Sequence, residues 1–223
     1  MTDAHCHVSC GDATVREFVV GRDFFGIHPW ETVGRTDVEV GSVASSLRAQ
    51  LLSNPAAGVG EIGLDRLKER TISAAMREIF EVQLGLAIEL RRPVVLHGAK
   101  CWGQVVEAVR RLVGRTGASC PPQALLFHGF SRSDGLIPDI VALNGYISVG
   151  PAILNDHAVN YRELARKIPA DRLLVETDRT EENASECPHV RDVLAKLAEI
   201  RGDDLSSLVA RTDSNADRFM GMQ

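Results

Sequence analysis

Short apolar runs of strand-like character alternate with segments of helical periodicity, and this alternation limits the possible folds more than any other feature. Strands are expected at residues 3–7, 15–20, 23–30, 57–63, 93–97, 124–128, 146–149 and 172–177. Helices are expected at residues 36–53, 72–91, 105–113, 136–143 and 158–167, with two more near 190–197 and 205–219. Strands that alternate with helices form a parallel sheet, and eight such strands fit a closed (β/α)8 barrel.

The first part of the chain leaves too little room for a complete barrel of this kind. The chain has 223 residues, whereas a (β/α)8 barrel typically takes about 250. Parallel neighbouring strands need a connection of about a dozen residues or more, and the first strand-like runs barely provide one. The predicted fold is therefore an α/β TIM (β/α)8 barrel with a shortened N-terminal strand–helix region. Residues 1–223 are expected to form it as a single domain.

Composition and charge narrow the class of protein. Apolar residues make up 44% and charged residues 25%, which is typical of a soluble globular protein. The formal net charge of −5 argues against a broad basic face that follows long duplex DNA. The net charge does not exclude a protein that binds the end of a nucleic acid in a pocket, because metal ions there supply positive charge. No apolar run approaches the roughly 18 residues that span a bilayer, so no membrane contact is expected.

The cysteines point to a reducing compartment. They lack the C-x-x-C spacing of a structural zinc cluster, and a chain of this length does not need a secreted disulfide framework. They are Cys6, Cys10, Cys101, Cys120 and Cys187. We expect a cytoplasmic protein that is a monomer or a small homo-oligomer.

Metal-type ligands stand at the ends of the strand-like runs. The first run carries Asp3, His5 and His7, which strand alternation turns to one side. The later candidates are Glu61, His97, His128 and Asp178. The active site of a parallel barrel is built at the carboxyl ends of its strands. A lone histidine or carboxylate at such a place is more often structural, but five segments that share the pattern indicate a metal site.

This set of ligands suits two metal ions. Neutral imidazoles and carboxylates bind zinc, manganese or iron, and magnesium where more oxygen ligands are present. Two ions about 3.5–4 Å apart can generate a hydroxide and stabilise both the attacking and the leaving oxygen of a displacement. Glu61 is the natural bridge because each of its oxygens can take one ion. Asp178 is the candidate general base, so Glu61 and Asp178 are the two candidate catalytic residues.

Six short motifs carry a resemblance to a known family. They lie at residues 3–7, 26–29, 60–65, 93–97, 127–131 and 174–178. The most specific parts are residues 60–65 and 176–178. With these motifs, and over nearly its whole length, the chain resembles the TatD family of metal-dependent deoxyribonucleases, which belongs to the amidohydrolase superfamily of barrels.

The resemblance implies a barrel with a two-metal site that hydrolyses the phosphodiester bonds of DNA, largely as a 3′–5′ exonuclease. The implied cofactors are two divalent ions of magnesium, manganese or zinc. The ligands that the resemblance assigns to one ion are His5, His7, Glu61 and Asp178, and those of the other are Glu61, His97 and His128.

The chain departs from the family pattern around the expected substrate pocket. Lys100 stands near the place where the family often has an arginine, and Arg132 and Arg179 replace small residues. These three are candidate phosphate-binding residues, and each could equally be a solvated surface charge. His28 is a fourth substrate-binding candidate, at an expected strand end, or a residue that simply caps its loop.

Three kinds of function follow from these observations. The leading one is hydrolysis of DNA ends or single-stranded DNA. The alternative is a hydrolase of the same superfamily that acts on a small-molecule ester, amide or lactone. The shortened N-terminal region, the acidic net charge and the altered pocket residues favour this alternative. The third is a non-catalytic binding barrel, and the complete ligand set counts against it.

Overall fold

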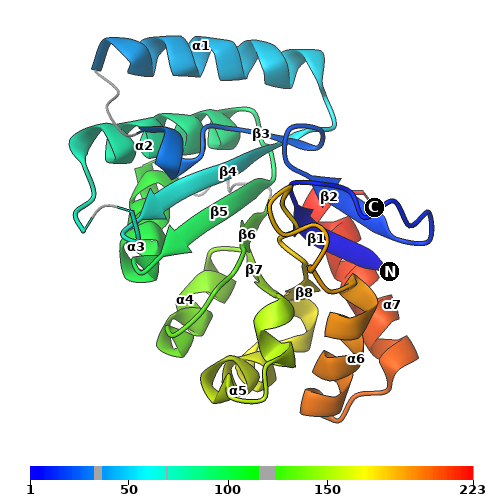
Figure 1. The fold of residues 1–223 in the computed structure, drawn as a ribbon. Helices are drawn as coiled ribbons and strands as arrows, with labels where there is room; N and C mark the ends of the chain where they lie inside the picture. Colours follow the sequence, from blue (N-terminus) through cyan, green and yellow to red (C-terminus); the bar gives the residue numbers. More distant parts are fainter. Residues whose placement is uncertain (33–36, 69, 116–123, 223) are drawn as a thin grey trace.

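The computed structural model describes residues 1–32, 37–68, 70–115 and 124–222 and shows strands surrounded by helices (Figure 1). The strands are β1 (Thr2–Cys6), β2 (Arg16–Val19), β3 (Phe24–Phe25), β4 (Gly58–Asp65), β5 (Val94–Ala99), β6 (Leu125–Phe127), β7 (Gly145–Val149) and β8 (Leu173–Val175). The α-helices are α1 (Asp37–Ser53), α2 (Ala74–Glu89), α3 (Trp102–Arg115), α4 (Ile137–Ala142), α5 (Val159–Lys167), α6 (Val190–Arg201) and α7 (Leu205–Met220).

All of these strands pair in parallel and follow the order of the sequence. Six of them, β3 to β8, form one sheet, and β1 and β2 form a separate ladder. Val20 and Phe24 form an isolated parallel bridge between the two. On the other side, the amide of Asp178 donates to the carbonyl of His5 at 3.0 Å, although no strand ladder joins β8 to β1 in the described ranges. The predicted TIM-type α/β barrel is confirmed.

The N-terminal region is shortened, as predicted. Residues 7–15 connect β1 to β2 and contain no helix. The C-terminal helix α7 lies beside β1 (Figure 1) and holds these strands in place. Thr2 Oγ1 donates to Asp213 at 2.7 Å, and the guanidinium of Arg16 pairs with Asp217 at 2.5 Å. A helix from the far end of the chain thus supports the region that has no crossover helix of its own.

The third strand is shorter than predicted. The sequence predicts a strand over residues 23–30, but only Phe24 and Phe25 pair with β4. The chain then enters a 3-10 turn at Pro29, which has no amide hydrogen to give to a ladder. His28 therefore lies on a loop at the mouth of the barrel. Thr36, the predicted first residue of the next helix, lies outside the described residues.

The strands are covered on both faces, which explains their continuous apolar character in the sequence. Every residue of β4 is buried, and so are Val94, Val95 and Leu96 of β5. Parallel sheets between helices show this pattern. Phe80 of α2 packs into the same core. Such packing makes the strand ends a firm rim for a site. None of the helices in the described ranges is long and apolar enough to cross a membrane.

Candidate metal centre

Glu61 reaches the middle of the barrel mouth because β4 and β5 approach each other closely there. The register between these strands shifts between Val59 and Ile62. Gly63 has a φ of +155°, and a Cβ atom at this position would lie 2.0 Å from the carbonyl oxygen of His97. Only glycine fits such an approach. The contact brings Glu61 of β4 next to His97 of β5.

Four candidate donor atoms lie close together on one side of Glu61. Nε2 of His5 lies 3.4 Å from Glu61 Oε2 and 3.5 Å from Asp178 Oδ1. Nε2 of His7 lies 3.3 and 3.5 Å from the same two oxygens. The donor atoms of His5, His7 and Glu61 all lie within 4.8 Å of one another, and Asp178 contacts both imidazoles. These residues can therefore provide ligands for one ion.

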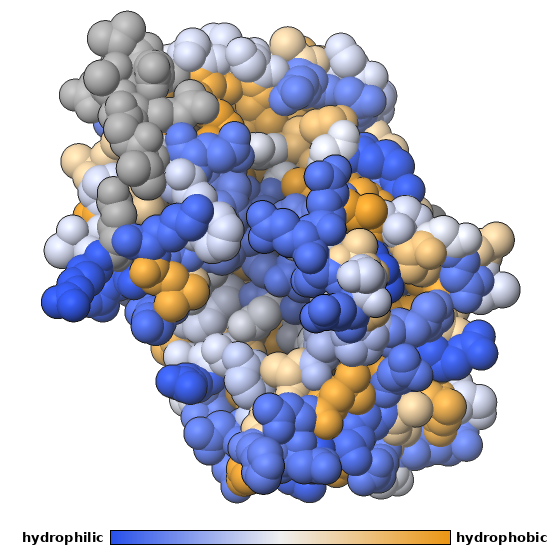
Figure 2. Space-filling view, viewed as in Figure 1, coloured by the Kyte–Doolittle hydropathy of each residue, from blue (hydrophilic) through white to orange (hydrophobic). Residues whose placement is uncertain are grey.

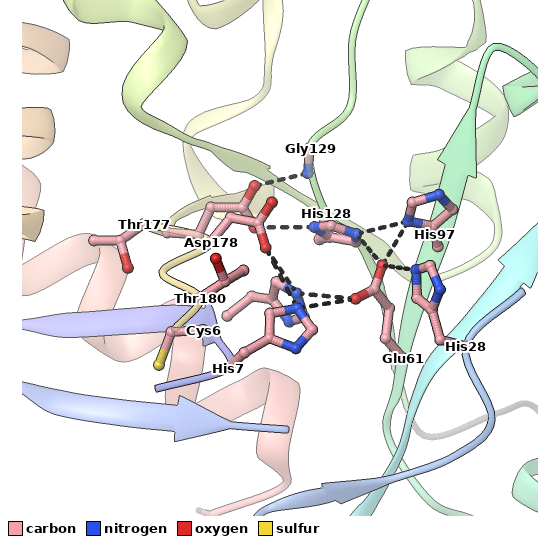
Figure 3. A network of polar contacts seen from close by, with 12 residues as sticks. Cys6, His7, His28, Glu61, His97, His128, Gly129, Thr177, Asp178 and Thr180 are labelled. Carbon is pink, nitrogen blue, oxygen red and sulfur yellow. Dashed lines mark hydrogen bonds and ion pairs between the residues drawn. The ribbon is translucent and has the colours of Figure 1, made fainter. Parts of the chain in front are cut away.

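A second set of donors lies on the other side of the same carboxylate. Oε1 of Glu61 lies 2.5 Å from His97 Nδ1 and 2.6 Å from His128 Nε2. The two nitrogens are 3.4 Å apart. Figure 3 shows the Glu61 carboxylate between these two imidazoles on one side and His7 on the other. Glu61 thus has one oxygen in each set, as a bridging ligand must.

Buried nitrogens without partners show that the residues fit a cation. Both ring nitrogens of His5 are buried and have no hydrogen-bond partner, and the same holds for Nδ1 of His128. Buried polar groups are normally hydrogen-bonded, so an orphaned imidazole nitrogen needs a reason. An ion between His5, Glu61 and Asp178 would supply that reason for Nε2 of His5, which lies 3.4 and 3.5 Å from the two carboxylates. Imidazole and carboxylate donors together suit a divalent metal ion.

The electrostatics of the centre draw protons to the imidazoles and keep the carboxylates ionised. Contacts with Asp178 and Glu61 raise the pKa of His7 to about 9. Burial lowers the pKa of His5, but the same carboxylates outweigh burial and raise it well above its usual value. Burial raises the pKa of Glu61 and Asp178, and the surrounding imidazoles reverse this effect and hold both well below their usual values. Both carboxylates are therefore charged at neutral pH, as metal ligands must be.

Asp65 fixes the ring of His97 from behind. Its Oδ2 lies 2.8 Å from His97 Nε2 and accepts the indole N–H of Trp30 at 2.9 Å. Its Oδ1 accepts the amides of Leu67 and Lys68 at 2.5 and 3.1 Å. A neutral imidazole that donates from Nε2 to a carboxylate presents Nδ1 as a lone pair. Asp65 thus both starts the following loop and sets the tautomer in which His97 can bind a metal.

We expect Asp65→Asn to lower the affinity for metal by about 10- to 100-fold, the usual effect of losing the carboxylate behind a ligating imidazole. The asparagine amide would donate to Nε2 and move the imidazole proton to Nδ1. Competition with a metal-binding dye measures this affinity. The matched control is Asp171→Asn, because Asp171 is 70% exposed and lies outside the site. Equal affinities for Asp65→Asn and the control would contradict the assigned role.

The loop after β8 is tied to β1 by the carboxylate of Asp3. Asp3 Oδ1 accepts the amide of Thr177 at 3.0 Å, and Oδ2 accepts the Thr177 hydroxyl at 2.5 Å. The next residue, Asp178, has a left-handed backbone with a φ of +50°. The sequence pattern puts Asp3 on the same side as His5 and His7. In the structure, however, both of its oxygens accept hydrogen bonds from Thr177. Asp3 therefore positions Asp178 and is not one of the donors.

Sequence reasoning missed Glu176, a buried carboxylate beside the centre. It accepts the amide of Gly129 at 2.7 Å and the hydroxyl of Ser148 at 2.5 Å. Its Oε2 lies 3.9 Å from Nδ1 of His128, and it supports the loop that carries this imidazole. Burial raises its pKa. The available signal was its place two residues before Asp178, because strand alternation puts such residues on one side.

Comparison with known proteins decides the family. The sequence model of the family described as TatD related DNase matches residues 13–221. This chain belongs to the TatD-related DNase family. The resemblance seen in the six motifs is confirmed.

Relatives in the TatD family share about a quarter of the residues of this chain. The uncharacterized metal-dependent hydrolase YabD of Bacillus subtilis (strain 168) is 26% identical over 203 residues, which cover 87% of this chain and 75% of YabD. The 3′-5′ ssDNA/RNA exonuclease TatD of Cronobacter sakazakii (strain ATCC BAA-894) is 28% identical over 206 residues, which cover 87% and 74%. This chain therefore spans about three quarters of the length of these relatives.

Solved structures of TatD relatives have the same fold. YjjV, a TatD homolog from Escherichia coli K12, superposes with a TM-score of 0.71 at 24% identity, over 94% of this chain and 78% of YjjV. A TatD family hydrolase from Entamoeba histolytica gives a TM-score of 0.69 at 15% identity, over 92% and 75%. The barrel of this chain is thus the barrel of the TatD family.

Two of the predicted substrate residues of this TatD-family chain line an open cavity above the donors. The cavity has a volume of about 760 Å³, and Lys100 and Arg132 line it together with His97, His128 and Asp178. Figure 2 shows a hollow bordered by hydrophilic surface near the middle of this face. Lys100 and Arg132 line this cavity and form no ion pair in the part of the chain that the structure describes. Their charges are therefore available to an anionic ligand.

The structure corrects the prediction for Arg179. Its guanidinium donates to the carbonyls of Ala184 and Cys187 at 2.5 and 3.1 Å, so its charge shapes the loop after β8. The physical reason lies in its backbone. The carbonyl of Arg179 accepts the amides of His7 and Val8, which fixes this residue in the seam with the N-terminal strand and directs its side chain into its own loop. Arg179 does not line the cavity.

His28 is brought to the centre by its loop. Its Nε2 lies 3.4 Å from Glu61 Oε1, and its Nδ1 accepts the amide of Trp30 at 3.1 Å. A neutral imidazole that accepts at one nitrogen carries its proton on the other. The Nε2 of neutral His28 is therefore an N–H donor at the mouth of the barrel. Nδ1 of His28 thus has a hydrogen-bond partner, whereas the buried nitrogens of His5 and His128 described above have none.

Proposed function

We propose that this chain is a metal-dependent phosphodiesterase that shortens single-stranded DNA from its ends, as a 3′–5′ exonuclease. The observation that carries the proposal is the pair of donor sets that share Glu61 at the floor of an open cavity. The activity named for the Cronobacter sakazakii relative supports it. We propose two divalent ions of magnesium, manganese or zinc as cofactors. A cytoplasmic location and one domain over residues 1–223 stay predictions.

The residues of the centre have separate roles in this proposal. Two divalent ions held by the donor sets would lower the pKa of a coordinated water and offset the charge of the phosphate. Glu61 holds the two sets at a fixed separation because its oxygens belong to both. Asp178 is ionised, and its side chain is 48% exposed toward the cavity, so it can accept the proton of the attacking water.

Three residues above the donors suit the phosphate. Lys100 provides a compact charge, and Arg132 provides a planar set of N–H groups that can bind two phosphate oxygens at once. Both follow strand ends and have left-handed backbones, with φ of +57° and +54°. The Nε2–H of His28, which lies 3.4 Å from Glu61 Oε1, can donate a further hydrogen bond beside the donors. The proposal thus gives the substrate charge partners outside the donor sets.

The decisive experiment compares wild type with Asp178→Asn on end-labelled single-stranded DNA with magnesium or manganese. Wild type should give products that shorten stepwise from the 3′ end, and a chelator should stop the reaction. Asparagine tolerates the left-handed backbone of this position, so the change removes the base without forcing the loop to move. We expect the rate to fall about a thousandfold, within the range for lost general-base catalysis.

Asp171→Asn is the surface control and should keep the wild-type rate. Absence of DNA cleavage by a wild-type protein that carries two ions would overturn the exonuclease proposal. It would direct the search to small-molecule esters, amides and lactones. A pure protein that binds no divalent ion would instead favour a non-catalytic barrel.

A further inference from the structure

A small side cavity opens beside Asp178, beyond the metal donors. It has a volume of about 150 Å³ and shares Gly129, Tyr161 and Asp178 with the larger cavity. Sites that bury a whole drug-sized ligand have about 300–1,000 Å³. The side cavity is therefore suited to one ring system and is too small for two nucleotides.

The walls of the side cavity suit an uncharged ring. Glu176 lies at its floor and is only 1% exposed, and both of its oxygens already accept hydrogen bonds, from Gly129 and Ser148. Phe130 and Pro151 contribute apolar surface. Among the described residues that line this cavity there is no lysine or arginine. A phosphate would lose its hydration there without a charge partner, whereas an apolar ring face would not.

Tyr161 stands at the border between the two cavities. Its ring is half-buried, and its hydroxyl makes no hydrogen bond within the part of the chain that the structure describes. It lies in the first turn of α5, which is held to the turn at Pro151–Leu154 by a hydrogen bond from Arg162 Nε to the carbonyl of Ile153 at 3.0 Å. That turn forms part of the cavity wall. The ring is thus a fixed aromatic surface at the entrance.

A second path leads out of the large cavity, away from the side cavity. Arg132 lines the large cavity and also a third one of about 480 Å³, which extends to Lys167 on α5. This path is open, and its lining carries Arg132 and Lys167 together with Asp134 and Glu163; Lys167 pairs with Asp134 at 2.5 Å. The side cavity has Glu176 in its lining and no lysine or arginine among the described residues, whereas the open path has the guanidinium of Arg132, so only the open path offers a phosphate a charge partner.

We infer that the side cavity receives the base of the 3′-terminal nucleotide, with the ring of Tyr161 against that base. The inference rests on the proposed exonuclease function and names its substrate-binding subsite. The scissile phosphate lies at the donors, and the rest of the strand leaves past Arg132. Because the cavity holds one base, the geometry favours removal of single nucleotides.

The test uses two single-stranded oligonucleotides that differ only at the 3′ end, one with a normal terminal nucleotide and one with an abasic terminal deoxyribose. Tyr161→Ala should lower kcat/KM about tenfold on the normal strand, as expected for loss of one base–aromatic contact. On the abasic strand, wild type and Tyr161→Ala should be equal. Tyr161→Phe keeps the ring and should match wild type on both strands.

Controls separate binding from folding. Tyr161→Leu keeps apolar volume without the ring, and it should behave as Tyr161→Ala does if both unfold at the wild-type temperature. Equal losses on the normal and abasic strands would show a structural role for Tyr161 and overturn the inference. A loss in Tyr161→Phe as large as in Tyr161→Ala would also overturn it.

A binding experiment keeps the subsite testable even without DNA cleavage. Calorimetry on the metal-loaded protein compares deoxyadenosine 5′-monophosphate with deoxyribose 5-phosphate. The inference expects Tyr161→Ala to weaken only the nucleotide. Nucleotide binding that does not depend on Tyr161 would overturn the subsite. Tyr161-dependent nucleotide binding without strand cleavage would overturn the exonuclease proposal and leave the subsite standing.

Discussion

Glu61→Gln should abolish hydrolysis and reduce bound metal from two ions per chain to at most one. Glutamine has the shape of glutamate, but it offers one oxygen and no charge, so it cannot bridge the sets that contain His7 and His97. If each ion stabilises the transition state by on the order of 3 kcal/mol, the loss of both corresponds to about a ten-thousandfold lower rate. Elemental analysis after gel filtration and the DNA assay measure the two effects.

Glu176→Gln is the matched control for this experiment. Glu176 is a buried carboxylate of the same barrel mouth, but its oxygens accept hydrogen bonds from Gly129 and Ser148 and take no part in either donor set. We expect this variant to keep two ions. A Glu61→Gln protein with two ions and wild-type activity would refute the bridging role.

The affinity for metal should rise steeply between pH 7 and pH 9. The pKa of His7 is raised to about 9, chiefly by Asp178. Burial lowers the pKa of His97, but Asp65 and Glu61 outweigh it and raise that pKa to about 9. A metal binds only the neutral imidazole, so each set releases one proton from these histidines below pH 9. The set with His97 should therefore lose about tenfold in affinity per pH unit, or about a hundredfold from pH 9 to pH 7, and the set with His5 and His7 should lose more because the pKa of His5 is raised as well.

Unfolding experiments provide an independent measurement of the same coupling. The imidazolium–carboxylate contacts stabilise the metal-free protein fully below the ordinary histidine pKa of about 6.5, and this contribution is lost as the pH rises through about 9. Metal binding has the opposite pH dependence. The decrease in Tm caused by a chelator should therefore be larger at pH 8.5 than at pH 6. A decrease that does not change with pH would contradict the coupling.

The sequence alone determined the fold class and the approximate position of most elements. The helix expected at residues 158–167 is observed as α5, Val159–Lys167, and the strand expected at 93–97 as β5, Val94–Ala99. Parallel strands between helices bury both faces, so each appears as a short apolar run that local patterns reveal. The candidate donors were found for the same reason, because they lie in such runs or shortly after them: His5, Glu61 and His97 are within β1, β4 and β5, and His128 and Asp178 follow β6 and β8. The ligand assignment itself stays a prediction.

The tertiary structure decided what each polar side chain contacts. Asp3 and Thr177 are 174 residues apart, and their hydrogen bonds set the place of Asp178. Arg179 turns to carbonyls of its own loop, and Tyr161 borders a cavity that no motif indicated. Periodic burial depends on residues that are close in the sequence, so the sequence alone reveals it. The contacts of a charged or aromatic side chain depend on which distant backbone closes around it, and that is fixed only when the barrel forms.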